Sequence, residues 1–309
     1  MTTTTAISRC RLVLAIAGVV LAAGCGKPPE IGRTQIKAKG NSDLQAYLLG
    51  HKPDLDQFRL RGPFAVTVKD DVEIPFAPGE TFEADLYLAA QAEKAPLVII
   101  LHGLEASKEL HAFQATHLAS WGMHCLALQL PNMGPWVANG KTLARIVQAI
   151  NRRPEIIDSR VDANKIILAG HSYGGAAVTV ALAEGAPATG GILLDPAVGE
   201  RDFPKILPKI NKPVLLLGAD VHVSAARNRD YFYRFMRSGI AEISIKDAAH
   251  EDGQFPSNVG IATEELQITF ASALAAAAFS LAAAGNFDYA WNSFREGSAY
   301  NRFISARKK

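Results

Sequence analysis

Short, uninterrupted apolar runs recur through the middle of the chain, and helix-like segments of mixed composition separate them. Strands that are buried on both faces of a parallel sheet have this pattern, because neither face meets water. Their alternation with helices predicts an α/β fold with a mostly parallel central sheet and helices on both faces. The expected strands are 97–101, 125–130, 166–169, 191–194 and 214–217, and the expected helices are 107–120, 143–150, 175–183, 225–237 and about 263–284.

Two earlier segments, 64–68 and 83–88, alternate apolar and polar residues instead. This alternation is typical of antiparallel strands, so we expect these two segments to be antiparallel. In open α/β sheets, ligands bind beyond the carboxyl ends of the strands. Chemically active side chains are therefore expected directly after each apolar run.

A Gly-His-Ser-Tyr-Gly motif at 170–174 stands between an expected strand and an expected helix. In this context the G-x-S-x-G pattern is typical of a nucleophile elbow, a sharp and strained turn that exposes a serine hydroxyl. Gly170 and Gly174 let neighbouring backbone pass close to the turn, and a helix N-terminus favours a developing anion. The motif and its setting together indicate that Ser172 is a catalytic nucleophile rather than a simple helix cap.

The sequence Leu-His-Gly-Leu at 101–104 follows an earlier apolar run. Acyl transfer needs two N–H donors that are directed at the negative oxygen of the tetrahedral intermediate. We expect these donors to be the backbone N–H groups of Leu104 and Tyr173. His102 is expected to shape the loop through hydrogen bonds rather than to transfer protons, and His171 is expected to pack beneath the elbow.

His250 follows a strand-like segment, 242–245, and is the expected general base, because chains with a nucleophile elbow carry serine, acid and histidine in that order. The acid holds the imidazole in one tautomer and stabilises the imidazolium. Two aspartates fit this order, since Asp195 ends the run 191–194 and Asp220 follows the run 214–217. Both lie at carboxyl ends of expected strands, so the pattern leaves both open.

The segment 97–285 resembles the α/β-hydrolases, in particular chlorophyllase-like and dienelactone-hydrolase-like enzymes and, more distantly, platelet-activating-factor acetylhydrolases. The resemblance is carried by His102-Gly103, 119–122, 128–131, 170–175, Leu194-Asp195-Pro196 and His250. In these relatives the acid follows the strand after the elbow, which implies Asp195, 23 residues beyond Ser172. Enzymes similar to cutinases and polyester hydrolases place the acid after the following strand and deeper in its loop, where this sequence has His222. Asp220, which follows that strand, stays as the alternative acid.

These residues predict a serine hydrolase that cleaves carboxylic esters through an acyl-serine intermediate. No cofactor is expected, and no set of side chains is spaced to bind a metal. The short segment between Asp195 and the run at 214 leaves little room for a large lid, so we expect an open site for a small or exposed ester. Trp136 is expected either to line this pocket or to pack in the core. An acyltransferase or peptidase on the same triad, or an inactive surface binding protein, is the alternative function.

Arg9 and Arg11 precede an apolar run at 12–23, which has the length of a signal-peptide core and is too short to span a bilayer. Small residues before Cys25 resemble a bacterial lipobox. They predict a lipoprotein signal peptide over 1–24 and a lipid on Cys25. We therefore expect an exported protein that a lipid anchors to a membrane, either in the outer membrane or facing the periplasm.

The rest of the chain is expected to comprise a flexible tether over 25–44, a catalytic domain over 45–285 and a C-terminal extension over 286–309. The polar composition of 26–45, with its paired prolines, is typical of a tether. Removal of Arg9 and Arg11 leaves 30 of the chain's 32 basic side chains, equal to its 30 acidic ones. The balanced charge therefore gives no reason to expect a nucleic-acid partner.

Overall fold

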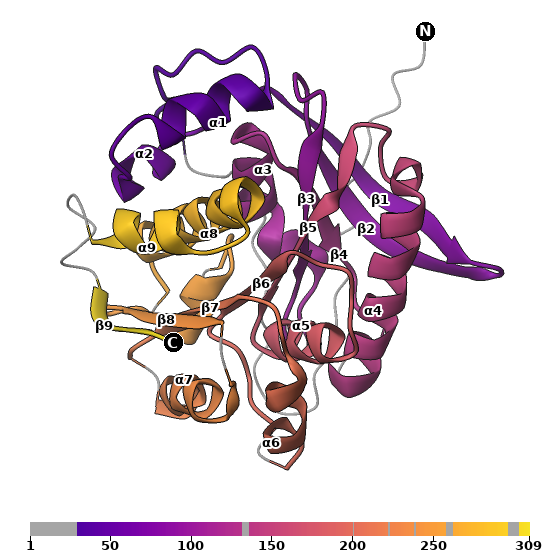
Figure 1. Cartoon of the computed structure of the whole chain (residues 1–309), viewed down its shortest axis with the longest axis vertical. Coiled ribbons are helices and arrows are strands. Elements are labelled where there is room, and N and C mark those ends of the chain that lie inside the picture. The colour runs from indigo at the N-terminus through magenta and orange to yellow at the C-terminus, as the bar shows by residue number, and fades with distance from the viewer. Residues whose placement is uncertain are drawn as a thin grey trace, which may run out of the picture.

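A computed structural model describes residues 30–131, 136–199, 201–221, 223–237, 239–257, 262–295 and 303–309. In this part of the chain, one mixed sheet lies between two layers of helices (Figure 1). The strands are β1 (Val66–Ala77), β2 (Glu80–Ala89), β3 (Ala95–Leu101), β4 (His124–Leu128), β5 (Val161–His171), β6 (Gly190–Leu194), β7 (Val214–Ala219), β8 (Ile240–Ile245) and β9 (Phe303–Lys308). The helices are α1 (Asn41–Leu49), α2 (Leu55–Phe58), α3 (Ala112–Ser120), α4 (Trp136–Arg152), α5 (Tyr173–Ala183), α6 (Phe203–Ile206), α7 (Val223–Phe235), α8 (Glu264–Ala284) and α9 (Asp288–Phe294).

The strands are arranged in the order β1-β2-β4-β3-β5-β6-β7-β8-β9. Neighbouring strands from β4 to β8 in this order run parallel. The pairs β1–β2, β2–β4 and β8–β9 are antiparallel, so the antiparallel strands lie at the two edges. The prediction of a mostly parallel sheet with helices on both faces is confirmed.

Side chains that alternate along each strand build one core on each face of the sheet. On β3, Val98 and Ile100 pack into the core that contains α3 and α8, whereas Leu97, Ile99 and Leu101 pack into the core that contains α4 and α5. All five side chains are fully buried. Burial on both faces explains why this strand has an uninterrupted apolar sequence.

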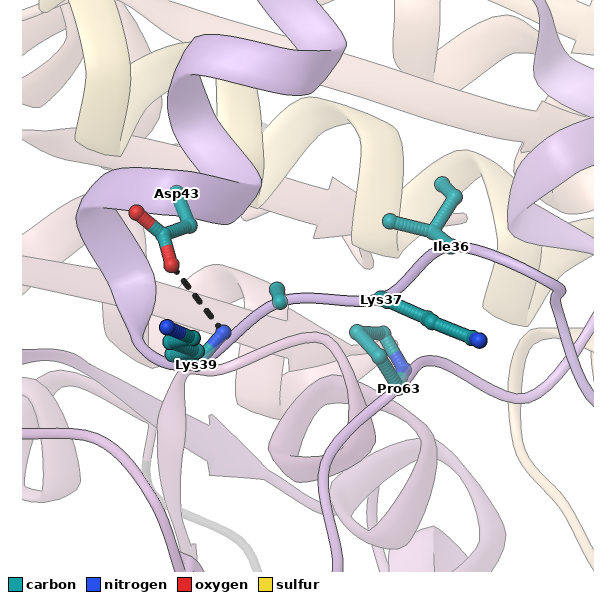
Figure 2. A pocket seen from close by; sticks show the side chains of 6 residues that line it. Ile36, Lys37, Lys39, Asp43 and Pro63 are labelled. Carbon is teal, nitrogen blue, oxygen red and sulfur yellow. Dashed lines mark hydrogen bonds between the residues drawn. The ribbon is translucent and has the colours of Figure 1, made fainter.

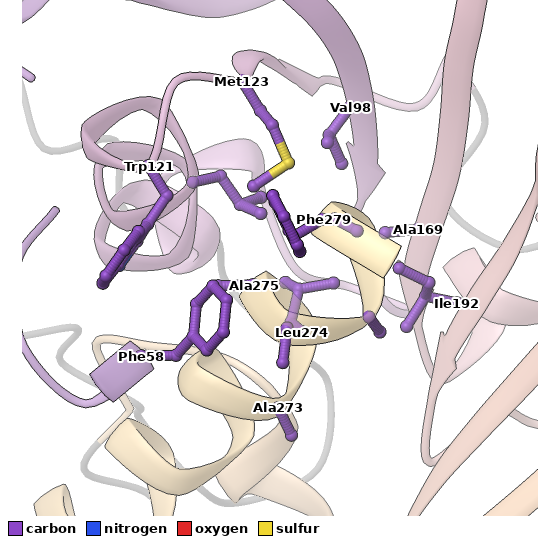
Figure 3. Close-up of a cluster of buried hydrophobic side chains, with 14 of the residues drawn as sticks. Phe58, Val98, Trp121, Met123, Ala169, Ile192, Ala273, Leu274, Ala275 and Phe279 are labelled. Atoms are coloured by element: carbon purple, nitrogen blue, oxygen red, sulfur yellow. The ribbon is translucent and has the colours of Figure 1, made fainter. Parts of the chain in front are cut away.

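The core on the α8 face combines large aromatic side chains with small ones (Figure 3). The Phe58 ring centroid lies 4.7 Å from that of Trp121 and 6.1 Å from that of Phe279. Ala273 and Ala275 of α8 lie in the same core (Figure 3). Complete burial of a phenylalanine side chain contributes about 1.5–3 kcal/mol to stability, so this cluster fixes α2 and α8 against the sheet.

Helix α8 is apolar and long enough to cross a membrane, but 89% of its 18-residue apolar window is buried inside the fold. The helix begins after Thr263, whose hydroxyl accepts a hydrogen bond from the Leu266 N–H. It ends at Gly285, which adopts a left-handed conformation with φ of 68°. The burial identifies α8 as a core helix.

The folded unit extends beyond 45–285 at both ends. Helix α1 begins at Asn41, inside the expected tether, and the Thr34 N–H donates to the Arg61 carbonyl oxygen over 2.9 Å. Ile36 packs against the core and, with Lys37, Ala38, Lys39, Asp43 and Pro63, lines a shallow hollow (Figure 2). Apolar residues and backbone pairing hold this segment against the body. The expected signal peptide, 1–24, and Cys25 lie outside the described residues.

Strand β9 lies in the expected C-terminal extension and pairs with β8 as the last strand of the sheet. Arg307 of β9 forms ion pairs with Asp230 and Glu242. Glu242 is buried on β8, so Arg307, together with the nearby charge of Arg229, compensates its carboxylate. Basic residues on a short edge strand also discourage pairing with other chains.

Candidate active site

Ser172 occupies the turn between β5, which ends at His171, and α5, which begins at Tyr173. Its backbone has φ of 53° and ψ of −120°, a strained conformation for a residue with a Cβ atom. A Cβ atom on Gly170 would lie 2.5 Å from the Gly174 carbonyl carbon, and one on Gly174 would lie 2.4 Å from the Leu101 carbonyl oxygen. The two glycines of the motif are therefore required for close backbone packing around the serine.

Asp195 and His250 meet at the carboxyl end of the sheet. Asp195 follows β6 and is fully buried, and its Oδ2 atom accepts a 2.6 Å hydrogen bond from the His250 Nδ1–H. Its Oδ1 atom accepts a 3.0 Å hydrogen bond from the Ala219 N–H at the end of β7. Both carboxylate oxygens are thus satisfied, and the imidazole is held in the tautomer that leaves Nε2 free of a proton.

Two opposing effects act on the pKa of His250. Burial lowers the pKa, whereas the hydrogen bond and negative charge of Asp195, assisted by the charge of Glu251, raise it. The two carboxylates together outweigh burial, so the pKa of His250 lies above its ordinary value. The His250 ring also lies against that of His171, the residue before the serine, with centroids 4.4 Å apart and the ring planes tilted by 41°. In this structure no hydrogen bond joins the Ser172 hydroxyl to His250, and such catalytic bonds often form only with substrate.

Asp220, the alternative acid, has a different environment. No hydrogen bond joins Asp220 to His250 in the described part of the chain, and the Asp220 N–H donates to the Ala248 carbonyl oxygen over 3.0 Å. Burial and the nearby charge of Asp247 raise the pKa of the Asp220 carboxyl. The structure therefore brings Asp195, and not Asp220, into contact with His250.

The loop after β3 lies directly against the serine. A Cβ atom on Gly103 would lie 3.1 Å from the Ser172 Cβ and 3.6 Å from its Oγ. The His102 Nδ1–H donates a 2.8 Å hydrogen bond to the Gly103 carbonyl oxygen. In a planar trans peptide the N–H points opposite to the carbonyl, so this bond directs the Leu104 N–H away from the His102 ring. The Tyr173 N–H, in the first turn of α5, has no acceptor within the helix.

Sequence reasoning missed Gln129, which supports this loop. Its Nε2 lies 2.9 Å from the His102 Nε2, and the Leu130 N–H donates to the same His102 nitrogen over 3.1 Å. The Gln129 Oε1 in turn accepts a 3.2 Å hydrogen bond from the Lys108 N–H. A polar residue that interrupts the apolar run 125–130 was the available signal.

Lys108 is a second feature that the sequence did not indicate. Its side chain is 1% exposed, and its Nζ lies 2.7 Å from Asp71, 3.1 Å from Asp85 and 2.8 Å from Glu109. Burial lowers the pKa of Lys108, but the hydrogen bonds to these carboxylates outweigh burial and raise it. These ion pairs attach the segment that follows the loop after β3 to β1 and β2.

Trp136, at the start of α4, is half-buried at the edge of the core on the α4–α5 face. Its ring centroid lies 5.8 Å from that of Tyr173, the residue after the serine, and 5.5 Å from that of Phe203. A Cβ atom on Gly199 would lie 2.2 Å from the Trp136 ring, so this glycine makes room for the indole. Within the described ranges, no group of three or more His, Cys, Asp or Glu side chains could hold a metal ion.

The mixed sheet, the strained serine between strand and helix, and the Asp–His pair beyond the strand ends define a protein of the α/β-hydrolase class. Comparison with protein families agrees, since the model of the alpha/beta hydrolase family matches residues 98–300. The chain belongs to this family, whose members are mostly hydrolases. A search of curated proteins finds no match to the chain.

Proposed function

We propose that the protein is a serine hydrolase that cleaves carboxylic esters through an acyl-serine intermediate. Ser172 attacks the ester carbonyl, and His250 takes the serine proton at Nε2 and then gives it to the leaving alcohol. Water enters next, loses a proton to His250 and attacks the acyl carbon. The bond from that carbon to the Ser172 oxygen then breaks, the acid leaves, and His250 returns the proton to the serine. Asp195 holds the imidazole and stabilises the imidazolium. The reaction in this form needs no cofactor.

One observation carries this proposal: a fully buried Asp195 accepts a 2.6 Å hydrogen bond from His250, whose ring contacts that of His171, the residue before Ser172. A buried carboxylate on an imidazole has few purely structural explanations, because burying the charge is costly unless it is paired. The strained conformation of Ser172 supports the same conclusion, since such strain is concentrated at functional sites.

The proposed substrates are small or exposed esters, with Trp136 beside Tyr173 lining the pocket. We further propose that the enzyme falls in the chlorophyllase-like and dienelactone-hydrolase-like branch, which rests on the Leu-Asp-Pro sequence at 194–196 and nearby motifs. A panel of chromogenic esters of graded acyl length, measured beside a matched amide, tests the function. Ester turnover that far exceeds amide turnover supports an esterase. Preferred amide cleavage would indicate a peptidase, and acyl transfer to an added alcohol in preference to water would indicate an acyltransferase.

Gly103→Val should depress kcat by about 10²-fold or more, because one oxyanion donor is displaced. Even a Cβ atom here would lie 3.1 Å from the Ser172 Cβ, so the two methyl groups of valine force the backbone of the loop to move. Steady-state kinetics on the preferred ester measure this loss. Gly40→Val is a matched control, because the nearest atom to its added Cβ lies at 3.8 Å. An unchanged kcat in folded Gly103→Val would remove this loop from the mechanism.

The proposed lipid anchor rests on the small residues before Cys25 and on the apolar run that precedes them. We expect the protein to be exported and to fractionate with membranes of the expressing bacterium, in the outer membrane or facing the periplasm. Cys25→Ser should abolish lipidation and leave a soluble or unprocessed protein. Mass spectrometry of the wild-type N-terminus checks this, and an N-terminus without lipid contradicts it.

A further inference from the structure

His171, the residue before the serine, contacts the loop that carries the histidine. Its Nε2 lies 2.8 Å from the His250 carbonyl oxygen, and because that oxygen can only accept, the His171 nitrogen carries the proton. The two imidazole rings are in tilted contact, with centroids 4.4 Å apart. One buried side chain therefore holds both the backbone and the ring of His250.

The same ring fills the space between two glycines. A Cβ atom on Gly253, in the turn that begins at His250, would lie 2.6 Å from the His171 Cδ2. A Cβ atom on Gly103, in the loop after β3, would lie 3.4 Å from the His171 Nδ1. His171 thus contacts both the turn His250–Gly253 and the loop after β3 that holds the proposed oxyanion donor. It is also the residue bonded to Ser172 in the chain.

We infer that His171 is a positioning residue, which holds His250 and the oxyanion loop in place relative to Ser172. This inference rests on the proposed function. The role needs a donor that does not titrate with His250. Burial, followed by the nearby charges of His250 and His111, holds the pKa of His171 well below its ordinary value. The titratable groups around the two rings are His102, His111, Asp195 and Glu251.

Loss of the His171 donor should loosen the His250 loop and weaken its contact with Asp195. Displacement of a catalytic group by about 1 Å can cost 10²-fold in rate, so we expect His171→Leu to lower kcat by about 10²-fold with little change in KM. The pKa of His250 should fall toward its ordinary value, because Asp195 then raises it less. His171→Gln, which keeps an N–H donor, should recover a substantial part of kcat.

His117→Leu is a matched control. His117 is also buried, and its Nε2 also donates to a backbone carbonyl, that of Phe58, over 2.6 Å. Its Nδ1, like that of His171, has no hydrogen-bond partner among the described residues. Burial lowers its pKa to about 4. In the described part of the chain its hydrogen bond to Phe58 and its ring contact with Phe113 involve none of Ser172, Asp195 and His250, so its replacement tests for general loss of stability. Thermal melts of all variants measure that loss.

The experiment measures kcat and KM for each variant and, independently of activity, the pKa of His250 by nitrogen-15 NMR of histidine-labelled protein. A lower kcat and a lower His250 pKa in His171→Leu alone support the positioning role. An unchanged pKa, or the same changes in His117→Leu, overturns it. Should wild type hydrolyse no ester while the His250 pKa falls only in His171→Leu, the proposed function fails and the positioning of His250 by His171 stands.

Discussion

Ser172→Ala should abolish ester hydrolysis, with kcat roughly 10⁶-fold below that of wild type. The hydroxyl is the atom that forms the acyl intermediate, and His250 cannot act without it. What remains should be the modest acceleration that the oxyanion loop and substrate binding supply to water attack. Stopped assays with concentrated enzyme on the preferred chromogenic ester measure the residual rate.

Ser280→Ala provides the control for this variant. Ser280 is a buried serine of α8, and its hydroxyl donates to the Asn286 carbonyl oxygen over 2.8 Å. This variant should melt at a lower temperature yet keep the kcat of wild type. A folded Ser172→Ala enzyme with substantial activity would place the nucleophile elsewhere.

Asp195→Asn should lower kcat by about 10⁴-fold while the fold is retained. The Ala219 N–H donates to Oδ1 and requires an acceptor at that position. An asparagine should therefore place its carbonyl oxygen there and turn its amide NH₂ toward His250. The His250 Nδ1 then becomes the acceptor, and its proton moves to Nε2. An imidazole in that tautomer cannot take the serine proton. Steady-state kinetics with thermal melts measure the effect.

Asp220→Asn is the paired variant and should cost far less, because no hydrogen bond joins Asp220 to His250 among the described residues. A large loss at Asp220 with a small one at Asp195 would transfer the orienting role to the later strand. Equal, modest losses would mean that the two carboxylates substitute for one another.

The pH profile tests the same contact with a predicted sign. His250 must be neutral to act as a base, so kcat/KM should fall as the pH drops through its pKa. Asp195 raises that pKa above its ordinary value, and wild type should therefore lose activity at a higher pH than an unperturbed imidazole would. In Asp195→Asn the negative charge that raises the pKa of His250 is gone, whereas burial still lowers that pKa. The fall of kcat/KM at acid pH should therefore move to lower pH.

The strands of the central sheet could be predicted because both of their faces are apolar, as on β3 and β7. Strand β9 could not, because only one neighbour pairs with it and its Arg307 and Lys308 resemble a polar tail. Helix α1 was missed for a similar reason. Its buried residues are Leu44 and Leu48 alone, too few to produce a periodic pattern.

The candidate site was predictable where local sequence determines geometry, as at the turn that holds Ser172. The residue pattern alone left two candidates for the acid, because β6 and β7 are neighbours and both end in an aspartate-containing loop. The family resemblance implied Asp195, and in the structure it is Asp195 that contacts His250. The hydrogen bond from His171 to the His250 carbonyl oxygen joins residues 79 positions apart, so no local sequence pattern predicts it.

The central claim is that Ser172 is the nucleophile of a covalent mechanism, and labelling with a fluorophosphonate probe tests it most directly. We expect wild type to incorporate one probe per chain, with peptide mass mapping that assigns it to Ser172. Asp195→Asn and His250→Gln should react much more slowly, and Ser172→Ala should not react. Labelling of Ser172→Ala at the rate of wild type, or the absence of label from folded wild type, would contradict the account.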